Sequence, residues 1–269
     1  MADLHLGKHT QYPSEYDASL LTPIPRSEGR KQLEFAEVPF VGADLWTGYE
    51  LSWLDDSGKP QVAVAEFTVP ANSAALIESK SFKLYLNSFN QTRFTRWGEV
   101  SQRLEVDLSQ CAGGPVLVQL FTLANYQKLG VADLPGTCID NLDVAIDCYH
   151  PDPSLLDVTD VGEVQETLHS HLLKTNCPVT DQPDWASVMV RYRGRQISRE
   201  GLLKYLISFR QHQDFHEQCV ERIFMDILSR CGPDELDVYA RYTRRGGLDI
   251  NPWRSTSNAT PTSFRLVRQ

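Results

Sequence analysis

A chain of 269 residues is long enough to bury a full hydrophobic core, as one large domain or as two small ones. Its composition, 41% hydrophobic and 23% charged, is typical of a soluble globular protein, and no apolar run is long enough to span a membrane. The net charge of −9 argues against binding a nucleic-acid backbone, which requires a basic surface. The acidic excess lies in the first half, because residues 1–150 carry 11 basic and 19 acidic side chains and residues 151–269 carry 15 and 16.

The cysteines and the N-terminus indicate the cellular compartment. The six cysteines form no CxxC pair and no short disulfide framework, and the first residues are unlike a signal peptide. We therefore expect a cytoplasmic protein with free thiols.

The first half of the chain begins with residues 1–40, which are polar and dotted with prolines and predict an arm with little regular structure. Two apolar runs, residues 45–54 and 61–69, flank the turn sequence Asp-Asp-Ser-Gly-Lys-Pro and predict a β-hairpin. Apolar side chains then recur at helical spacing, and Gly113-Gly114 is expected to end the second helix. The elements that complete this half are helices over residues 78–89 and 100–112 and strands over residues 116–123 and 142–148.

The second half repeats this order after a connector over residues 150–165, which opens with His-Pro-Asp-Pro. Ser198 is placed to cap a helix that runs to Arg210. A further helix that starts near Asp214 carries one apolar stripe from Cys219 to Leu228. The strands of this half are expected over residues 167–175, 186–192, 236–242 and 263–267.

Both halves therefore read strand, strand, helix, helix, strand, strand, which suggests an internal duplication. We divide the chain into the arm (1–40), an N-terminal module (41–150) and a C-terminal module (151–269). The order predicts an α+β fold of two ββααββ modules with antiparallel sheets. A single module would expose edge strands, so we expect a homodimer or a higher homo-oligomer.

The candidate nucleophile is Cys177, which follows a predicted strand and precedes Pro178. Together with Pro183, this proline restricts the backbone of the loop, and Asp184 lies seven residues after the thiol. A thiolate is the reactive form of cysteine and needs a neighbour that takes its proton, so the two side chains have the parts of a nucleophile and a proton carrier. The alternative is that Cys177 is a small buried hydrophobe, the commonest role of a cysteine.

Two acidic side chains have structural explanations as well as functional ones. Glu78 precedes a helix on which Lys80 and Lys83 share a face, and a carboxylate is stabilised at a helix start by the helix dipole. Asp214 and Glu217 fit a capping box, which would make Glu217 a purely structural residue.

Four arginines cluster near the end of an otherwise acidic chain, beside Gly246-Gly247. Flexible backbone next to guanidinium groups suits a phosphate, although a basic surface turn gives the same pattern. No GxGxxG follows a predicted strand, so a Rossmann cofactor domain is not supported. The four are Arg241, Arg244, Arg245 and Arg254.

A zinc-dependent alternative rests on two histidines. His169 and His171 are two apart on a predicted strand, face the same way, and are close in sequence to Cys177. Such a set would suit a hydrolase acting on a purine or pterin. In a third alternative the chain is a non-catalytic purine-binding module, and Cys177 would be inert to alkylation at neutral pH.

Four motifs carry a family resemblance. They are ESKSFKLY from Glu78, NCPVTDQPDW from Asn176, FHE from Phe215 and RRGGLDINP from Arg244. In sequence and order they resemble the long, two-module form of the QueF-type 7-cyano-7-deazaguanine (preQ0) reductases. The resemblance implies a tandem tunnelling fold (T-fold), in which antiparallel sheets from several modules close into a barrel with ligand sites between modules.

The resemblance also implies an activity. It is the reduction of the nitrile of preQ0 to the aminomethyl group of preQ1 with two NADPH, a step of queuosine biosynthesis for tRNA modification. The substrate would be the free base, with no nucleic acid or membrane as a partner and no metal.

The same resemblance assigns roles to individual residues. Cys177 would form a thioimide with the nitrile carbon, Asp184 would move the proton, and His216 would donate a proton in later steps. The substrate would be held by Glu78, Ser79, Phe215 and Glu217. NADPH would be held by Ser79, Lys80, Lys83, Arg244, Arg245 and Gly246.

Overall fold

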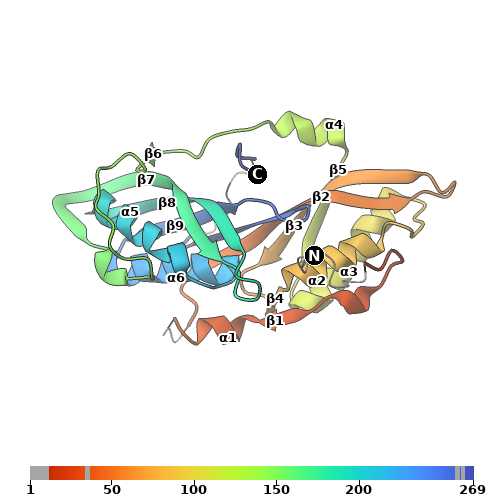
Figure 1. The fold of residues 1–269 in the computed structure, drawn as a ribbon, viewed down its shortest axis with the longest axis horizontal. Coiled ribbons are helices and arrows are strands. Elements are labelled where there is room, and N and C mark those ends of the chain that lie inside the picture. Colours follow the sequence, from red (N-terminus) through yellow and green to blue (C-terminus); the bar gives the residue numbers. More distant parts are fainter. Residues whose placement is uncertain (1–11, 34–36, 258–260, 262–263) are drawn as a thin grey trace, which may run out of the picture.

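A computed structural model describes residues 12–33, 37–257, 261 and 264–269 of the chain. Its centre is an eight-stranded sheet in the order β5-β3-β2-β10-β9-β8-β7-β6 (Figure 1). Neighbouring strands are antiparallel except for β6, which is parallel to β7. The strands are β2 (Val41–Leu54), β3 (Pro60–Pro70), β5 (Leu117–Phe121), β6 (Thr137–Cys138), β7 (Val158–Asn176), β8 (Pro183–Ile197), β9 (Glu235–Tyr242) and β10 (Leu248–Ser255).

Helices and short elements complete the fold. A two-stranded sheet pairs β1 (Pro23–Pro25) with β4 (Ala75–Ile77). In Figure 1, α2 and α3 lie on the β2–β3 side of the molecule and α5 and α6 on the β7–β9 side, while α4 and β6 belong to the segment along the top of the view. The helices are α1 (Arg26–Arg30), α2 (Ser79–Ser88), α3 (Trp97–Ala112), α4 (Leu123–Tyr126), α5 (Arg199–Ser208) and α6 (His216–Cys231).

The two halves of the chain share one sheet because β10 pairs with β2 over eight residues, with Ile250 opposite Trp46. All eight residues of β10 are buried, although several are polar. The mixed, antiparallel-rich α+β fold expected from the sequence is confirmed. Within the described chain the sheet is open, so the closed barrel and the tandem T-fold arrangement stay predictions.

Most of the expected elements form close to their expected positions. The hairpin is β2 and β3, α3 ends at Gly113 with a φ of 64°, and the Ser198 hydroxyl accepts a hydrogen bond from the Gly201 N–H at the start of α5. The connector is shorter than expected, because β7 begins at Val158. Within the described residues 12–33, the arm contains β1 and α1, more regular structure than expected.

Two expected strands are wrong. Residues 142–148 are irregular, and β6 at Thr137–Cys138 pairs with the sheet edge instead. Of the last expected strand, residue 263 lies outside the described residues, and residues 264–267 form no strand, although Arg265 makes an isolated bridge to Val131. The fourth strand of the second half is β10. It was not expected, because its buried polar residues interrupt the alternation of apolar and polar side chains that predicts a strand.

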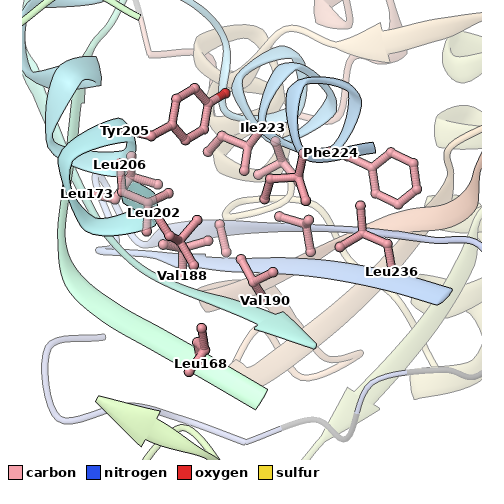
Figure 2. Close-up of a cluster of buried hydrophobic side chains, with 14 of the residues drawn as sticks. Leu168, Leu173, Val188, Val190, Leu202, Tyr205, Leu206, Ile223, Phe224 and Leu236 are labelled. Atoms are coloured by element: carbon pink, nitrogen blue, oxygen red, sulfur yellow. The ribbon is translucent and has the colours of Figure 1, made fainter. Parts of the chain in front are cut away.

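Apolar side chains pack in two main clusters on the helix-bearing face of the sheet. One joins β8 and β9 to α5 and α6, through residues such as Val188, Val190, Leu202 and Phe224 (Figure 2). The other joins β2 and β3 to α2 and α3, and takes Leu248 and Ile250 from β10. A third, smaller cluster includes Leu134, Met189, Tyr239 and Leu266, so the segment before β6 and the chain end pack together with side chains of β8 and β9.

A cluster of buried charges ties the arm to the sheet. Arg26 Nη2 lies 2.6 Å from Asp44 Oδ2, and Arg254 Nη2 lies 2.8 Å from both Asp44 Oδ1 and Glu221 Oε1. Arg30 Nη2 lies 2.8 Å from Glu221 Oε1. We call these five residues the buried ion cluster. Removal of any one partner would leave a buried charge without compensation, which is strongly destabilising.

No helix in the described part of the chain combines the length and apolar character needed to cross a membrane.

Candidate active site

A pocket of about 330 Å³ lies where the two halves of the chain meet. The N-terminal half contributes Trp46 of β2 and the start of α2, and the C-terminal half contributes the β7–β8 loop, the start of α6 and the β9–β10 turn. The polar side chains that line it are Glu78, Ser79, Lys80, Lys83, Cys177, Thr180, Asp184, Asp214, His216, Glu217, Thr243 and Arg245.

The β7–β8 loop that presents Cys177 is closed by its own backbone. The Cys177 N–H donates to the Gln182 carbonyl at 2.9 Å, and the Asp181 N–H donates to the Cys177 carbonyl at 3.0 Å. Asp181 has a φ of 57°, a left-handed conformation that Asp tolerates better than most residues. The thiol therefore projects from a tight loop beside the first residues of β8.

The surroundings of the Cys177 thiol favour its ionised form. Burial by itself raises the pKa of the thiol. Hydrogen bonds from the Thr180 hydroxyl and from the N–H groups of Val179 and Thr180, together with the charge of Arg245, outweigh burial and hold this pKa below its ordinary value. Cys177 is half-buried and lines the pocket, so its surroundings are compatible with the nucleophile expected from the sequence, whose role stays a prediction.

Asp184 is 4% exposed and makes two charged contacts. Arg245 Nη1 lies 2.5 Å from Asp184 Oδ1, and His216 Nε2 lies 3.3 Å from Asp184 Oδ2. Burial raises the pKa of Asp184, but the hydrogen bonds and charges of His216 and Arg245 lower it below the ordinary value. Asp184 is therefore a carboxylate at neutral pH.

His216 is fixed on both sides. Its ring stacks on Tyr242 with 3.7 Å between ring centroids and 3° between ring planes. Its Nδ1 is buried and makes no hydrogen bond within the described protein, while Nε2 faces Asp184. The ring is therefore held in one orientation, with Nε2 directed at the Asp184 carboxylate.

Glu78 occupies the N-cap of α2. Its carboxylate accepts the Lys80 N–H at 2.8 Å and the Ser81 N–H at 2.6 Å. The structural explanation offered by the sequence is therefore correct, but it is not complete, because Glu78 also lines the pocket. A carboxylate has about four acceptor positions, so an oriented Glu78 can still bind a ligand.

Glu217 does not belong to the expected capping box. Helix α6 begins at His216 with Phe215 as its N-cap, and the Phe215 N–H donates to Gln218 Oε1 at 3.4 Å. The Asp214 carboxylate accepts the N–H of Phe215. Gln218, one residue further along, takes the capping role that was expected of Glu217. Glu217 instead lines the pocket.

The Glu217 side chain is 3% exposed, and its pKa is raised to about 8. Burial is the main cause, and repulsion by the Asp44 carboxylate adds to it, while Arg26 and Arg254 act in the opposite direction. Burial therefore favours the protonated form of this pocket carboxyl group, and the charges of the buried ion cluster adjust its pKa in both directions.

The expected cofactor residues divide into two groups. Ser79, Lys80, Lys83 and Arg245 line the pocket with Phe215, whereas Arg244 and Gly246 are absent from its lining. The pKa of Lys83 is lowered by burial and by Arg245. Gly246 lies against the Lys83 side chain, and the exposed Arg244 stacks over the Tyr49 ring at 4.8 Å.

Two of the four clustered arginines lie in the interior. Arg254 is fully buried in the buried ion cluster, and Arg241 is 4% exposed, with bonds to Gln269 and Tyr239. Neither can contact a phosphate at the surface, so the predicted basic cluster reduces to Arg244 and Arg245. Lys80, Lys83 and Arg245 line the pocket and Arg244 is exposed on the same turn as Arg245, so this set of cations fits a phosphate-bearing cofactor.

Several parts of the site have no recognisable signal in the sequence. Arg245 and Asp184, which form an ion pair, are 61 residues apart in the chain. No sequence pattern indicated the hydrogen bond from Thr180 to Cys177. The apolar walls were not expected either, because their residues come from four segments that only the fold brings together. They are Ile24, Trp46, Leu76, Ile77, Leu248 and Ile250.

Comparison with known proteins places the chain in a family. Residues 12–120 match the family described as "Nitrile reductase, 7-cyano-7-deazaguanine-reductase N-term", and residues 183–261 match "QueF-like protein". Proteins named NADPH-dependent 7-cyano-7-deazaguanine reductase from Bordetella pertussis and Bordetella bronchiseptica are each 56% identical, over 100% of this chain and 99% of their own. The chain belongs to the QueF family of NADPH-dependent nitrile reductases.

The family expected from the four motifs is therefore confirmed, and with it the class of enzyme and the cofactor. The zinc hydrolase and the non-catalytic module gain no support, because these relatives are named as reductases. A solved structure, the archaeosine synthase QueF-Like in the apo form, aligns over 38% of this chain and 100% of its own with a TM-score of 0.32 and 19% identity. That likeness is too low to carry an argument.

Proposed function

We propose that this chain reduces the nitrile of 7-cyano-7-deazaguanine to an aminomethyl group, with Cys177 as covalent nucleophile. The observation that carries the proposal is an activated thiol in the same pocket as an ionised Asp184, a fixed His216 and two carboxyl groups, Glu78 and Glu217. The chemistry of the reaction accounts for each of them.

The first step is addition of Cys177 to the nitrile. The sulfur bonds to the nitrile carbon, one C–N π bond breaks, and the nitrogen takes a proton, which gives a thioimide. Asp184, kept ionised by Arg245 and His216, accepts the thiol proton and returns it to the nitrogen. Addition makes the carbon a better hydride acceptor than the nitrile was.

The following steps need two hydrides, and NADPH supplies one hydride each time it binds. After the first, the bond to Cys177 sulfur breaks and the leaving thiolate remains stabilised by Thr180. The resulting imine must stay enclosed, because water would hydrolyse it. His216, hydrogen-bonded to Asp184 through Nε2, passes a proton to the nitrogen as the imine becomes the amine.

Two carboxyl groups are positioned to hold the base. Glu78 comes from the start of α2 and Glu217 from the start of α6, so they reach the pocket from different halves of the chain. A carboxylate that accepts two parallel N–H bonds matches the hydrogen-bonding edge of a guanine-like ring. Phe215 and Ser79 lie beside them and would cover the ring.

The cations around the pocket would hold NADPH. Lys80 is exposed, Lys83 is half buried against Gly246, and Arg244 is exposed on the β9–β10 turn. Ser79 adds a hydroxyl at the same helix start. Because the substrate carboxylates and these cations are different groups, spent cofactor can leave while the base stays bound.

The open sheet supports assembly into an oligomer of this chain. Strand β5 ends one side of the sheet, and β6 pairs with β7 over only two residues at the other. Sheet edges of this kind pair readily with another chain, so we propose that barrel closure of the T-fold type occurs between copies. Light scattering of the purified protein would report a monomer if this is wrong.

The test of the catalytic proposal is the mass of the intact protein after mixing with preQ0 and no NADPH. We expect the mass to rise by one ligand in the wild type and to stay unchanged in Cys177→Ala. Cys148→Ser serves as the thiol control and should still form the adduct. A wild-type protein that binds preQ0 without any mass increase would rule out covalent catalysis.

A further inference from the structure

A second cluster of reactive side chains lies outside the pocket. Cys138 on β6 and His169 and His171 on β7 place one possible ligand atom each within 4.8 Å of one another. Among the residues that the structure describes, this is the one group of three His, Cys, Asp or Glu side chains with such spacing. None of the three lines the pocket, and Cys138, rather than Cys177, is the thiol beside the histidines.

The backbone around Cys138 is built to run close to β7. Gly136 has a φ of 88°, and a Cβ there would lie 2.1 Å from the Thr167 carbonyl oxygen, so no other residue fits without a shift. The Ile139 N–H donates to the His169 carbonyl at 3.0 Å. The Asp140 carboxylate accepts the His171 N–H at 3.0 Å. These contacts place the thiol over the two imidazoles before any ligand arrives.

The histidine rings are also oriented. His169 Nδ1 lies 3.0 Å from the Pro135 carbonyl, which can only accept, so Nδ1 carries the proton and Nε2 keeps a lone pair. His171 Nδ1 lies 2.8 Å from Ser187 Oγ. Metal-binding histidines commonly have such a partner on the other ring nitrogen, because it fixes the tautomer and the direction of the lone pair.

We propose that Cys138, His169 and His171 bind one Zn²⁺ ion. Thiolate and imidazole are the ligands that zinc prefers, and three protein ligands leave one position for solvent. Zn–S and Zn–N bonds of about 2.3 and 2.0 Å put tetrahedral ligand atoms roughly 3.5 Å apart, so side-chain adjustments of about 1 Å close the site. Cys138 is exposed, which gives an ion a way in.

The ion would fasten the segment between the two halves to the edge of the sheet. Strand β6 makes only two residue pairs with β7. A zinc bond through the Cys138 sulfur would therefore add an attachment at an edge that few backbone pairs hold. All three ligands lie between residues 120 and 183, outside both stretches that match the family descriptions. None of the three lines the candidate active site, so the proposed zinc site is a separate place in the molecule.

Titration of tag-free protein with Co²⁺, which reports thiolate ligation by a charge-transfer absorption band, tests the proposal. We expect one Co²⁺ per chain with this band in the wild type, and displacement of Co²⁺ by Zn²⁺. Cys177→Ala and Cys148→Ser should retain the band, whereas Cys138→Ser should lose it. His169→Ala and His171→Ala should weaken Co²⁺ binding at least tenfold.

Thermal melting gives a second measurement on the same proteins. Zn²⁺ should raise the melting temperature of the wild type and of Cys148→Ser, but not of Cys138→Ser, which should keep its reductase activity. A band that persists in Cys138→Ser, a band lost in Cys177→Ala, or no bound Co²⁺ in the wild type would each overturn the proposal.

Discussion

Arg245 Nη1 lies 2.5 Å from Asp184 Oδ1, although 61 residues separate them in the chain. The contact joins the β9–β10 turn to the first residues of β8, and it places a guanidinium group between the expected proton carrier and the expected cofactor site. Arg245 lowers the pKa of Asp184 and contributes to lowering that of Cys177. Arg245 therefore contacts the expected proton carrier and is itself one of the residues expected to bind the cofactor.

Arg245→Gln should impair adduct formation at low pH. An arginine next to a carboxylate favours the ionised form, so its loss should raise the Asp184 pKa and move the acid limb of the adduct rate to higher pH, while His216 still acts on the carboxylate. The rate of adduct formation without NADPH, measured against pH, isolates this effect from cofactor binding. Arg245→Lys keeps the charge and should shift the limb less. An unchanged pH profile in Arg245→Gln would mean that the ion pair between Arg245 and Asp184 does not affect adduct formation.

The sequence predicted those parts of the fold that depend on local periodicity. The hairpin of β2 and β3 and the helices α3, α5 and α6 follow from apolar spacing and from caps such as Gly113 and Ser198. Apolar spacing does not predict strand β10. Arg254 and Asp249 look like surface residues in the sequence, but both are buried, Arg254 against acids of distant elements and Asp249 against the Tyr49 hydroxyl.

The candidate site residues come from short motifs, and the structure places most of them around one pocket while their roles stay predictions. Short motifs identify Cys177, Glu78 and His216, because each lies in a run whose letters are specific. The sequence does not show which of these residues touch, since Arg245 meets Asp184 only after the strands pair. Nor does it distinguish Gln218 from Glu217 as the helix-start partner, because a shift of one residue in α6 exchanges their roles.

Asp184→Asn should slow addition of Cys177 to preQ0 far more than it weakens ligand binding. The amide keeps the shape of the side chain but cannot accept the thiol proton, a loss of about 10²–10⁴-fold in rate for general acid–base catalysis. Stopped-flow or quenched mass analysis would give the rate. Asp181→Asn is the matched control in the same loop and should react normally. Near-normal rates in Asp184→Asn would remove Asp184 from the mechanism.

Glu217 gives a prediction about the pH dependence of binding. If the ionised carboxylate accepts the N–H groups of the base, affinity should rise with pH and level off above the Glu217 pKa of about 8. The measurement is calorimetric titration of preQ0 into Cys177→Ala, where binding stays non-covalent. In the double variant with Glu217→Gln, affinity should fall tenfold or more at high pH and lose this dependence. A double variant that binds equally well would mean that Glu217 does not hold the base.

The same carboxyl group affects stability in the opposite direction. Folding raises the Glu217 pKa from 4.5 to about 8, so between these values the folded state binds more protons than the unfolded state. The stability that the protonated Glu217 contributes is fully present below about pH 4.5 and is lost as the pH rises toward 8. Melting temperatures of the wild type and Glu217→Gln should therefore diverge across this window, with the variant less sensitive to pH.

Glu78 needs variants that separate its two roles. Glu78→Ala removes both the cap and the pocket carboxylate, and it should cost about 1 kcal/mol of stability as well as substrate affinity. Glu78→Asp keeps a good capping residue but shortens its reach, so stability should be nearly retained while affinity falls. Melting and calorimetry on both variants would show this. Equal affinity for preQ0 in Glu78→Asp and the wild type would mean that Glu78 caps α2 but does not bind the substrate.

The stoichiometry of the reaction tests whether the pocket keeps its intermediate. Conversion of C≡N to CH2–NH2 takes four electrons, and each NADPH delivers two of them as one hydride. The imine must therefore remain bound while the cofactor is exchanged, which requires Glu78 and Glu217 to hold the base independently of the cations Lys80 and Arg244. We expect two NADPH oxidised per preQ0 consumed, followed by absorbance and product analysis, and the same ratio in Cys138→Ser and after chelation. A ratio of one with release of aldehyde and ammonia would show that the imine escapes, because hydrolysis would then compete with the second hydride.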